Sequence, residues 1–166
     1  MSKTLVVAFA FGVPREIWSN RAIATIARSE AWKNDATVYT QLDVPIHGDF
    51  YVVRTEEDPG DPPPTLRIAR GAVEWAKRHD VQKLVIVAAK PHIPRAKRDT
   101  EYAVREAGVD IEVTVSALLD DPEYSDEDQW YCSDSTQPRT QTRKNWQKRD
   151  KILMLMPMFV YKRVAG

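Results

Sequence analysis

The chain has 166 residues, of which 43% are hydrophobic and 29% charged, a composition typical of one soluble globular domain. Lys plus Arg and Asp plus Glu both number 24, so no overall field favours nucleic acid or an anionic membrane. A single cysteine, Cys132, excludes an internal disulfide and a multi-cysteine zinc site, and it favours a reducing compartment. The apolar runs at 5–13 and 152–160 are too short to span a bilayer. We therefore expect a cytoplasmic protein with no membrane partner.

The first two thirds of the chain alternate strand and helix patterns. A continuous apolar run at 5–11 predicts a strand buried on both faces, as in the centre of a parallel sheet. Ser19 or Asn20 is placed to cap a helix that extends to about residue 33. Residues 36–42 and 50–55 are rich in β-branched and aromatic side chains and predict two further strands.

A proline-rich stretch at 56–64 separates these elements from the next helix, because proline lacks a backbone donor and restricts its predecessor. Thr65 stands at the cap position of that helix, which extends to about residue 79. Residues 84–89 predict a central strand, a helix from Pro94 to 107 follows and ends at Gly108, and 111–115 predict a last strand. This order predicts a Rossmann-like three-layer α/β/α fold with a mostly parallel sheet of about five strands.

The last third differs in composition. Residues 120–129 hold six carboxylates and predict a surface loop, whereas 139–151 hold six basic residues and predict an exposed helix that turns apolar and ends at Pro157. We therefore divide the chain into an α/β domain, 1–118, and a segment, 119–166, whose C-terminal helix packs on that domain. The apolar end, 152–160, either covers the chain's own core or forms a homodimer interface, and the sequence leaves both open.

Trp146 lies among basic residues, a pattern that resembles a nucleic-acid contact. A single aromatic residue in a chain of zero net charge makes a poor binding platform, so we favour packing of Trp146 on the domain. Nucleic acid is accordingly not an expected partner.

The stretch 83–98 carries the strongest functional signal. An apolar strand ends, Lys90 and His92 follow, and Pro94 opens a helix with Arg95 in its first turn. Ligands of open α/β sheets bind at the carboxyl ends of the strands. A cation in the first turn opposes the helix dipole, which favours an anion held between Arg95 and the helix amides. His92 can transfer a proton near pH 7, or it can simply satisfy backbone groups before the helix.

Several other residues are candidates for the same site. Glu56 or Glu57 would reach it if the third strand lies near the fourth, Gly12 would lie at its floor, and Thr65 is a helix cap first and a ligand contact second. No dinucleotide fingerprint or Walker loop is present, so the cofactor stays unknown. The three histidines have no zinc-like spacing, and we expect no metal site.

These residues, in this order, resemble the YdcF-like family, whose biochemistry is largely undefined. The resemblance covers about 5–118 and rests on His92-Ile93-Pro94-Arg95-Ala96 after a buried strand, with Thr65 opening the preceding helix and Glu56 or Glu57 at a strand end. Leu66 and Arg67 stand where the family commonly has Glu-Asn, and the proline-rich insertion lengthens the loop that carries the glutamates. The resemblance implies a Rossmann-like domain with a polar pocket.

The leading hypothesis is a protein that binds a small anionic or nucleotide-like molecule at the strand ends. Arg95, Lys90 and Glu57 would contact the ligand, and His92 and Glu56 would be catalytic if the protein is a hydrolase or transferase. The alternative is a non-catalytic interaction module with a vestigial pocket. The sequence does not decide between an enzyme and a binding module.

Overall fold

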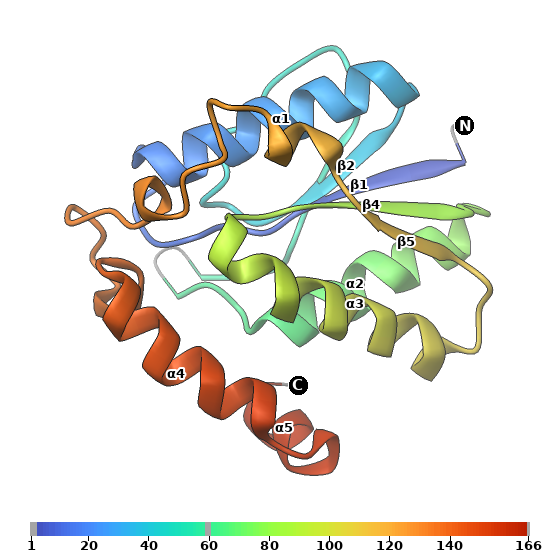
Figure 1. The fold of residues 1–166 in the computed structure, drawn as a ribbon. Coiled ribbons are helices and arrows are strands. Elements are labelled where there is room, and N and C mark those ends of the chain that lie inside the picture. The colour runs from blue at the N-terminus through green and yellow to red at the C-terminus, as the bar shows by residue number, and fades with distance from the viewer. Residues whose placement is uncertain (1–2, 59–60, 166) are drawn as a thin grey trace.

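Five parallel strands form a single sheet in the computed structural model, which describes residues 3–58 and 61–165 (Figure 1). The strands lie in the order β3-β2-β1-β4-β5, and every neighbouring pair is parallel. Their bounds are Thr4–Ala8 for β1, Thr37–Thr40 for β2, Val52–Arg54 for β3, Lys83–Val87 for β4 and Glu112–Val115 for β5. The expected five-stranded parallel sheet is confirmed.

Helices cover both faces of this sheet. Helix α1 (Trp18–Asn34) lies on one face, and α2 (Thr65–Arg78) and α3 (Ile93–Ala107) lie on the other (Figure 1). Successive strand side chains point to opposite faces, so Val6 of β1 packs with the α1 core while Leu5 and Val7 pack with the α2 and α3 core. Because β1 is buried on both faces, its sequence is continuously apolar. The predicted three-layer α/β fold is thereby confirmed.

The strand order reverses at the centre of the sheet. β1 pairs with β2 on one side and with β4 on the other, and Ala8 lies opposite Val87 at the carboxyl ends. The chain leaves these two strands in opposite directions, which opens a crevice between the loops that follow them. The loop after β1 and the short 3-10 helix η1 (Lys90–His92) after β4 therefore meet at one place.

The predicted caps of α1 and α2 are both wrong. Helix α1 begins at Trp18 after Ile17, which provides no side-chain cap. Ser19 donates to the carbonyl of Phe11 at 2.8 Å, and Asn20 accepts from the amide of Phe11 at 2.8 Å. Ser19 and Asn20 thus hold the loop after β1. Thr65 is already the first residue of α2 and makes no cap hydrogen bond.

The C-terminal segment contains two helices where one was predicted. After the 3-10 helices η2 (Ala117–Asp120), η3 (Asp128–Trp130) and η4 (Pro138–Thr140), α4 spans Arg143–Leu155 and α5 spans Met158–Ala165. The predicted helix therefore begins four residues later than 139, and Pro157 lies in the turn before a second helix. Trp146 packs on the domain as predicted, with 4% of its surface exposed. Among the described residues, no helix is long and apolar enough to cross a membrane.

Buried polar contacts attach α4 and α5 to α2 and α3. Leu153 and Tyr161 pack with Leu66 in a small apolar cluster. Arg98 donates to the carbonyl of Leu153 at 3.0 Å, and Tyr161 donates to Asp99 at 2.5 Å. The pKa of Asp99 is raised overall, because the effect of burial is larger than the opposing effect of the hydrogen bonds from Tyr161 and Arg98. The C-terminal segment is therefore part of the packed structure.

The acidic loop and the basic helix also form ion pairs with each other. Arg143 at the start of α4 lies 2.9 Å from Asp128 and 3.4 Å from Glu127. These side chains are exposed, so each pair contributes only about 0–1 kcal/mol.

Candidate functional site

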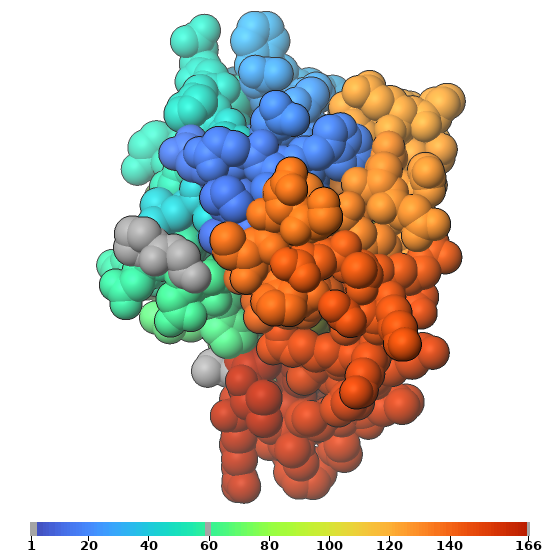
Figure 2. All heavy atoms as spheres, turned by 90° about the vertical axis from the view of Figure 1, so that its left-hand side faces the viewer, coloured from blue at the N-terminus to red at the C-terminus, as the bar shows by residue number. Residues whose placement is uncertain are grey.

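A cavity of about 150 Å³ lies at the crevice between β1 and β4. Its wall comes from the loop after β1, the start of α2, the start of α3 and the C-terminal segment. In Figure 1 the strands end toward the left-hand side of the molecule, and Figure 2 shows that side with the orange segment before α4 lying across it. The residues that line the cavity include Gly12, Thr65, His92, Arg95, Arg139, Trp146 and Arg149.

Gly12 lines this cavity, as expected, and its backbone conformation and close neighbours leave no room for another residue. Its φ of +96° lies in the left-handed region, which other residues rarely adopt. A Cβ at this position would lie 2.7 Å from the hydroxyl of Ser135 and 2.8 Å from that of Thr140. Glycine is therefore required where the C-terminal segment closes on the loop after β1.

His92 is buried at the centre of the site, with 5% of its surface exposed. Its Nε2 lies 3.1 Å from the hydroxyl of Thr65, so the side chain expected to cap α2 instead contacts the imidazole. Nδ1 is buried and has no hydrogen-bond partner among residues 3–58 and 61–165. Burial, and then the nearby Arg95 and Arg139, lower the pKa of His92 well below its usual value. The imidazole is therefore neutral at pH 7.

Arg95 faces the same cavity, as predicted, but a carboxylate already contacts it. Its Nε lies 2.9 Å from Oδ1 of Asp150 in α4, without the alignment of a hydrogen bond, and its guanidinium lies 4.9 Å from the ring centre of Trp146. Only 7% of Arg95 is exposed. Burial raises the pKa of Asp150, and Arg95 and Arg98 oppose that rise. Sequence reasoning missed Asp150, although it is the only acidic residue of the basic run.

Arg139 and Arg149 complete the cavity wall, and neither was predicted. Neither forms a hydrogen bond or an ion pair with the part of the chain that the structure describes. Burial, followed by repulsion from Arg149 and Arg95, lowers the pKa of Arg139 to about 10. Burial and Arg95 also lower the pKa of Arg149. Three arginines thus line a small cavity, although Arg149 is exposed, and within the described chain the one carboxylate in ion-pair contact with any of them is Asp150, at Arg95.

The predicted carboxylates line a different cavity. Glu56 and Glu57 border a neighbouring cavity that shares only Pro62, Pro63 and Pro64 with the first. Glu57 accepts a hydrogen bond from the amide of Leu42 at 3.0 Å and another from the hydroxyl of Thr55. The expected approach fails because β3 is an edge strand, separated from β4 by β2 and β1.

Lys90 also lies outside the cavity. Its ammonium group is 3.8 Å from Asp120, and the side chain borders a third cavity next to η2. Of the predicted site residues, the structure therefore brings together Gly12, Thr65, His92 and Arg95. It does not bring Glu56, Glu57 or Lys90 to them.

Within the described ranges, no group of three or more His, Cys, Asp or Glu side chains is placed to hold a metal ion. No family model, curated protein or solved structure matches the chain. The resemblance to the YdcF-like family therefore stays a prediction.

Proposed function

We propose that the protein binds a small anion, of about the size of phosphate, in the cavity between β1 and β4. The observation that carries this proposal is the set of three arginines, Arg95, Arg139 and Arg149, around one small cavity. Arg139 and Arg149 form no hydrogen bond or ion pair with the described chain, and repulsion from a neighbouring guanidinium is larger than the attraction of Asp61 for Arg139 or of Asp150 for Arg149. A bound anion would turn that repulsion into attraction.

The ends of two helices favour the same ligand. Thr65 begins α2 and Ile93 begins α3, so both helices start at or beside the cavity. Helix N-termini carry a partial positive charge, which favours anions. At α3 this charge is the contribution, because the amide of Ile93 donates to the carbonyl of Ala89 and Pro94 has no N–H. The unpartnered Nδ1 of the buried His92 is a further polar group available to a ligand. A neutral imidazole can donate one hydrogen bond to an anion without adding a fourth positive charge.

The size of the cavity narrows the ligand. Its volume is about 150 Å³, whereas pockets for drug-sized ligands occupy roughly 300–1,000 Å³. An engineered cavity of about 150 Å³ in another protein holds benzene. A phosphate or the phosphate group of an ester therefore fits inside, while a nucleoside would remain outside. The cavity volume therefore restricts the expected anionic or nucleotide-like ligand to a molecule with a small anionic group, such as a phosphate, that can enter the cavity.

The binding proposal is tested by titrating inorganic phosphate into the wild type and into Arg139→Gln at low ionic strength, by calorimetry and by thermal unfolding. Loss of a charged hydrogen-bond donor should weaken phosphate binding by about 10- to 100-fold. Arg105→Gln is the matched control, because it removes the same charge from an exposed position of α3 outside the cavity. The proposal fails if phosphate does not stabilise the wild type, or if Arg139→Gln responds as the wild type does.

Turnover is a second candidate function, and the contact between Thr65 and His92 favours it. A hydroxyl within 3.1 Å of a neutral imidazole has the geometry of a nucleophile next to its base. In this reaction Thr65 attacks phosphorus, the bond to the leaving oxygen breaks, and His92 passes the hydroxyl proton to that oxygen. Water then attacks phosphorylated Thr65, which releases phosphate and restores the threonine.

Phosphate release from a panel of small phosphomonoesters separates turnover from binding. Thr65→Val should abolish release and leave phosphate affinity within about threefold, whereas Thr65→Ser should retain activity because it keeps the hydroxyl. If the wild type binds phosphate but releases none from any ester, the alternative of a non-catalytic module is favoured. A cytoplasmic location stays a prediction.

A further inference from the structure

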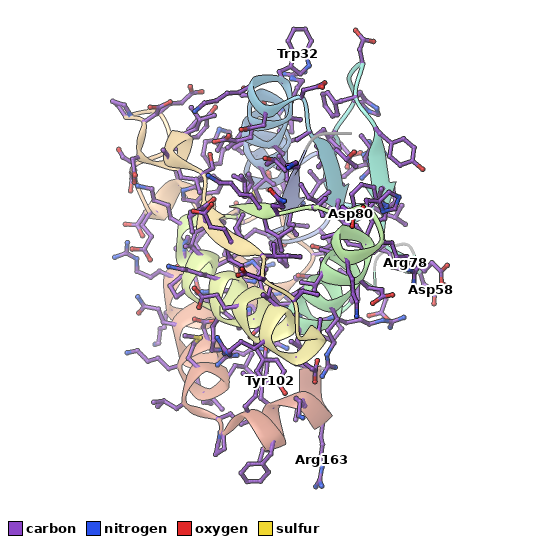
Figure 3. The ribbon with its side chains drawn as sticks, turned by 90° about the vertical axis from the view of Figure 1, so that its right-hand side faces the viewer. Trp32, Asp58, Arg78, Asp80, Tyr102 and Arg163 are labelled. Atoms are coloured by element: carbon purple, nitrogen blue, oxygen red, sulfur yellow. The ribbon has the colours of Figure 1, made fainter. Side chains whose placement is uncertain are left out.

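The corner between α4 and α5 carries large apolar side chains that no part of the described chain covers. Leu155 is 84% exposed, Phe159 68% and Ile152 58%. The corner forms one extremity of the molecule (Figure 1), and in Figure 3 Arg163 of α5 lies at that end while Trp32 lies at the opposite end. This accumulation at one extremity requires an explanation, because soluble monomers rarely group such residues.

Helical geometry places these residues on a single outer stripe. An α-helix turns by about 100° per residue, so residues three, four and seven apart share a face. Trp146, Asp150 and Leu153 face the domain. The opposite stripe of α4, all of it exposed, consists of Lys144, Lys148, Lys151, Ile152 and Leu155. The stripe is therefore basic along α4 and apolar at the corner.

The second helix continues the same pattern. Phe159 and Arg163 lie four residues apart on α5, and both are exposed. Residues 143–165 contain seven Lys and Arg and one acidic residue, Asp150, which contacts Arg95. Lys144, Lys148, Lys151 and Arg163 form no ion pair with the described residues. The apolar corner is thus flanked by free positive charge.

We propose that this corner docks on the surface of an anionic lipid bilayer. Leu155 and Phe159 enter the boundary between headgroups and acyl chains, and the basic residues contact the anionic headgroups. We expected no membrane partner because no segment can span a bilayer, but a surface contact needs no spanning segment. The proposal is independent of the anion-binding cavity.

Charge and shape disfavour the other occupants. A second copy related by a twofold axis would bring two basic stripes together, and like charges repel. Nucleic acid would attract the lysines, but its affinity comes mainly from phosphate contacts and would leave Leu155 and Phe159 unused. A lipid surface is the partner that uses both kinds of side chain.

The test is sedimentation of the full chain with vesicles of phosphatidylcholine alone and with vesicles containing phosphatidylserine. Binding should require phosphatidylserine and should weaken as salt is raised. Leu155→Ser with Phe159→Ser should weaken binding by at least about tenfold. Lys148→Gln with Lys151→Gln should weaken it by about fivefold for each charge removed.

Trp32→Ser is the matched control, because Trp32 is 68% exposed, as Phe159 is, and lies at the far end of the molecule (Figure 3). It should leave vesicle binding unchanged, and circular dichroism should show that every variant is folded. The proposal is overturned if the wild type binds neither vesicle, or binds both equally. It is also overturned if only the lysine variants lose binding, or if the chain is a dimer that Leu155→Ser with Phe159→Ser dissociates and that binds no vesicle.

Discussion

Replacing Asp150 with asparagine should destabilise the protein strongly, because it removes the carboxylate that is in ion-pair contact with the guanidinium of Arg95. Arg95 is 7% exposed, and the Asp150 carboxylate is 2.9 Å from its Nε. Removing one partner of a buried ion pair costs about 3–5 kcal/mol. Arg139 and Arg149 also repel Arg95, and the nearby Asp99 already pairs with Arg98, so it compensates the loss only in part. For a chain of this length, the melting temperature should fall by about 6–20 °C.

A double-mutant cycle measured by urea unfolding at pH 7 tests this reasoning. Arg95→Met should also destabilise, because it leaves the Asp150 carboxylate buried without its partner. Arg95→Met combined with Asp150→Leu should lower the free energy of unfolding by less than the sum of the two single changes, since no unpaired charge remains. A loss below about 1 kcal/mol for Asp150→Asn, or strict additivity in the cycle, would refute the view that the pair is buried and mutually dependent.

Three further predictions concern the packing around this pair. Burial holds the pKa of His92 below its usual value, so below pH 6.5 the unfolded chain binds a proton that the folded chain excludes. The contribution of His92 to stability should therefore fall as the pH is lowered from 7 to 5, and His92→Gln should remove that contribution in urea titrations. Trp146→Ala should lower the free energy of unfolding by about 3–5 kcal/mol, whereas the exposed Lys144→Ala should change it by less than about 0.5 kcal/mol. Tyr161→Phe should cost about 1–3 kcal/mol in chemical denaturation, because Asp99 loses a hydrogen bond at a buried position, and an unchanged midpoint would show that Asp99 is not charged there.

The fold was predictable because hydrophobic periodicity is a local signal. β1 is buried on both faces and β4 lies beside it, so both appear in the sequence as continuous apolar runs. The helix caps were less predictable, since Ser19 and Asn20 have the right side chains for a cap but bind the loop after β1 instead. Tertiary contacts there override local preference.

Most of the site residues that were predicted correctly follow a strand end, and Thr65 is the exception. His92 and Arg95 come directly after β4, and the rule for open sheets places them at the crevice. Glu56 was placed wrongly because the order of strands in the sheet cannot be read from periodicity, and β3 proved to be the far edge. Arg139 and Asp150 were missed because charged residues in a basic run normally face water, whereas here η4 brings Arg139 to the cavity and α4 brings Asp150 to Arg95, and both are partly buried.

One wall of the cavity lies in the C-terminal segment and is therefore synthesised after the sheet. A nascent chain that has reached residue 118 already contains all five strands, yet it lacks Arg139, Trp146 and Arg149. Until those residues emerge from the ribosome, the crevice lacks one wall. Leu66 also lacks its packing partners Leu153 and Tyr161. The complete cavity wall therefore forms last in biosynthesis, after the sheet that supports it.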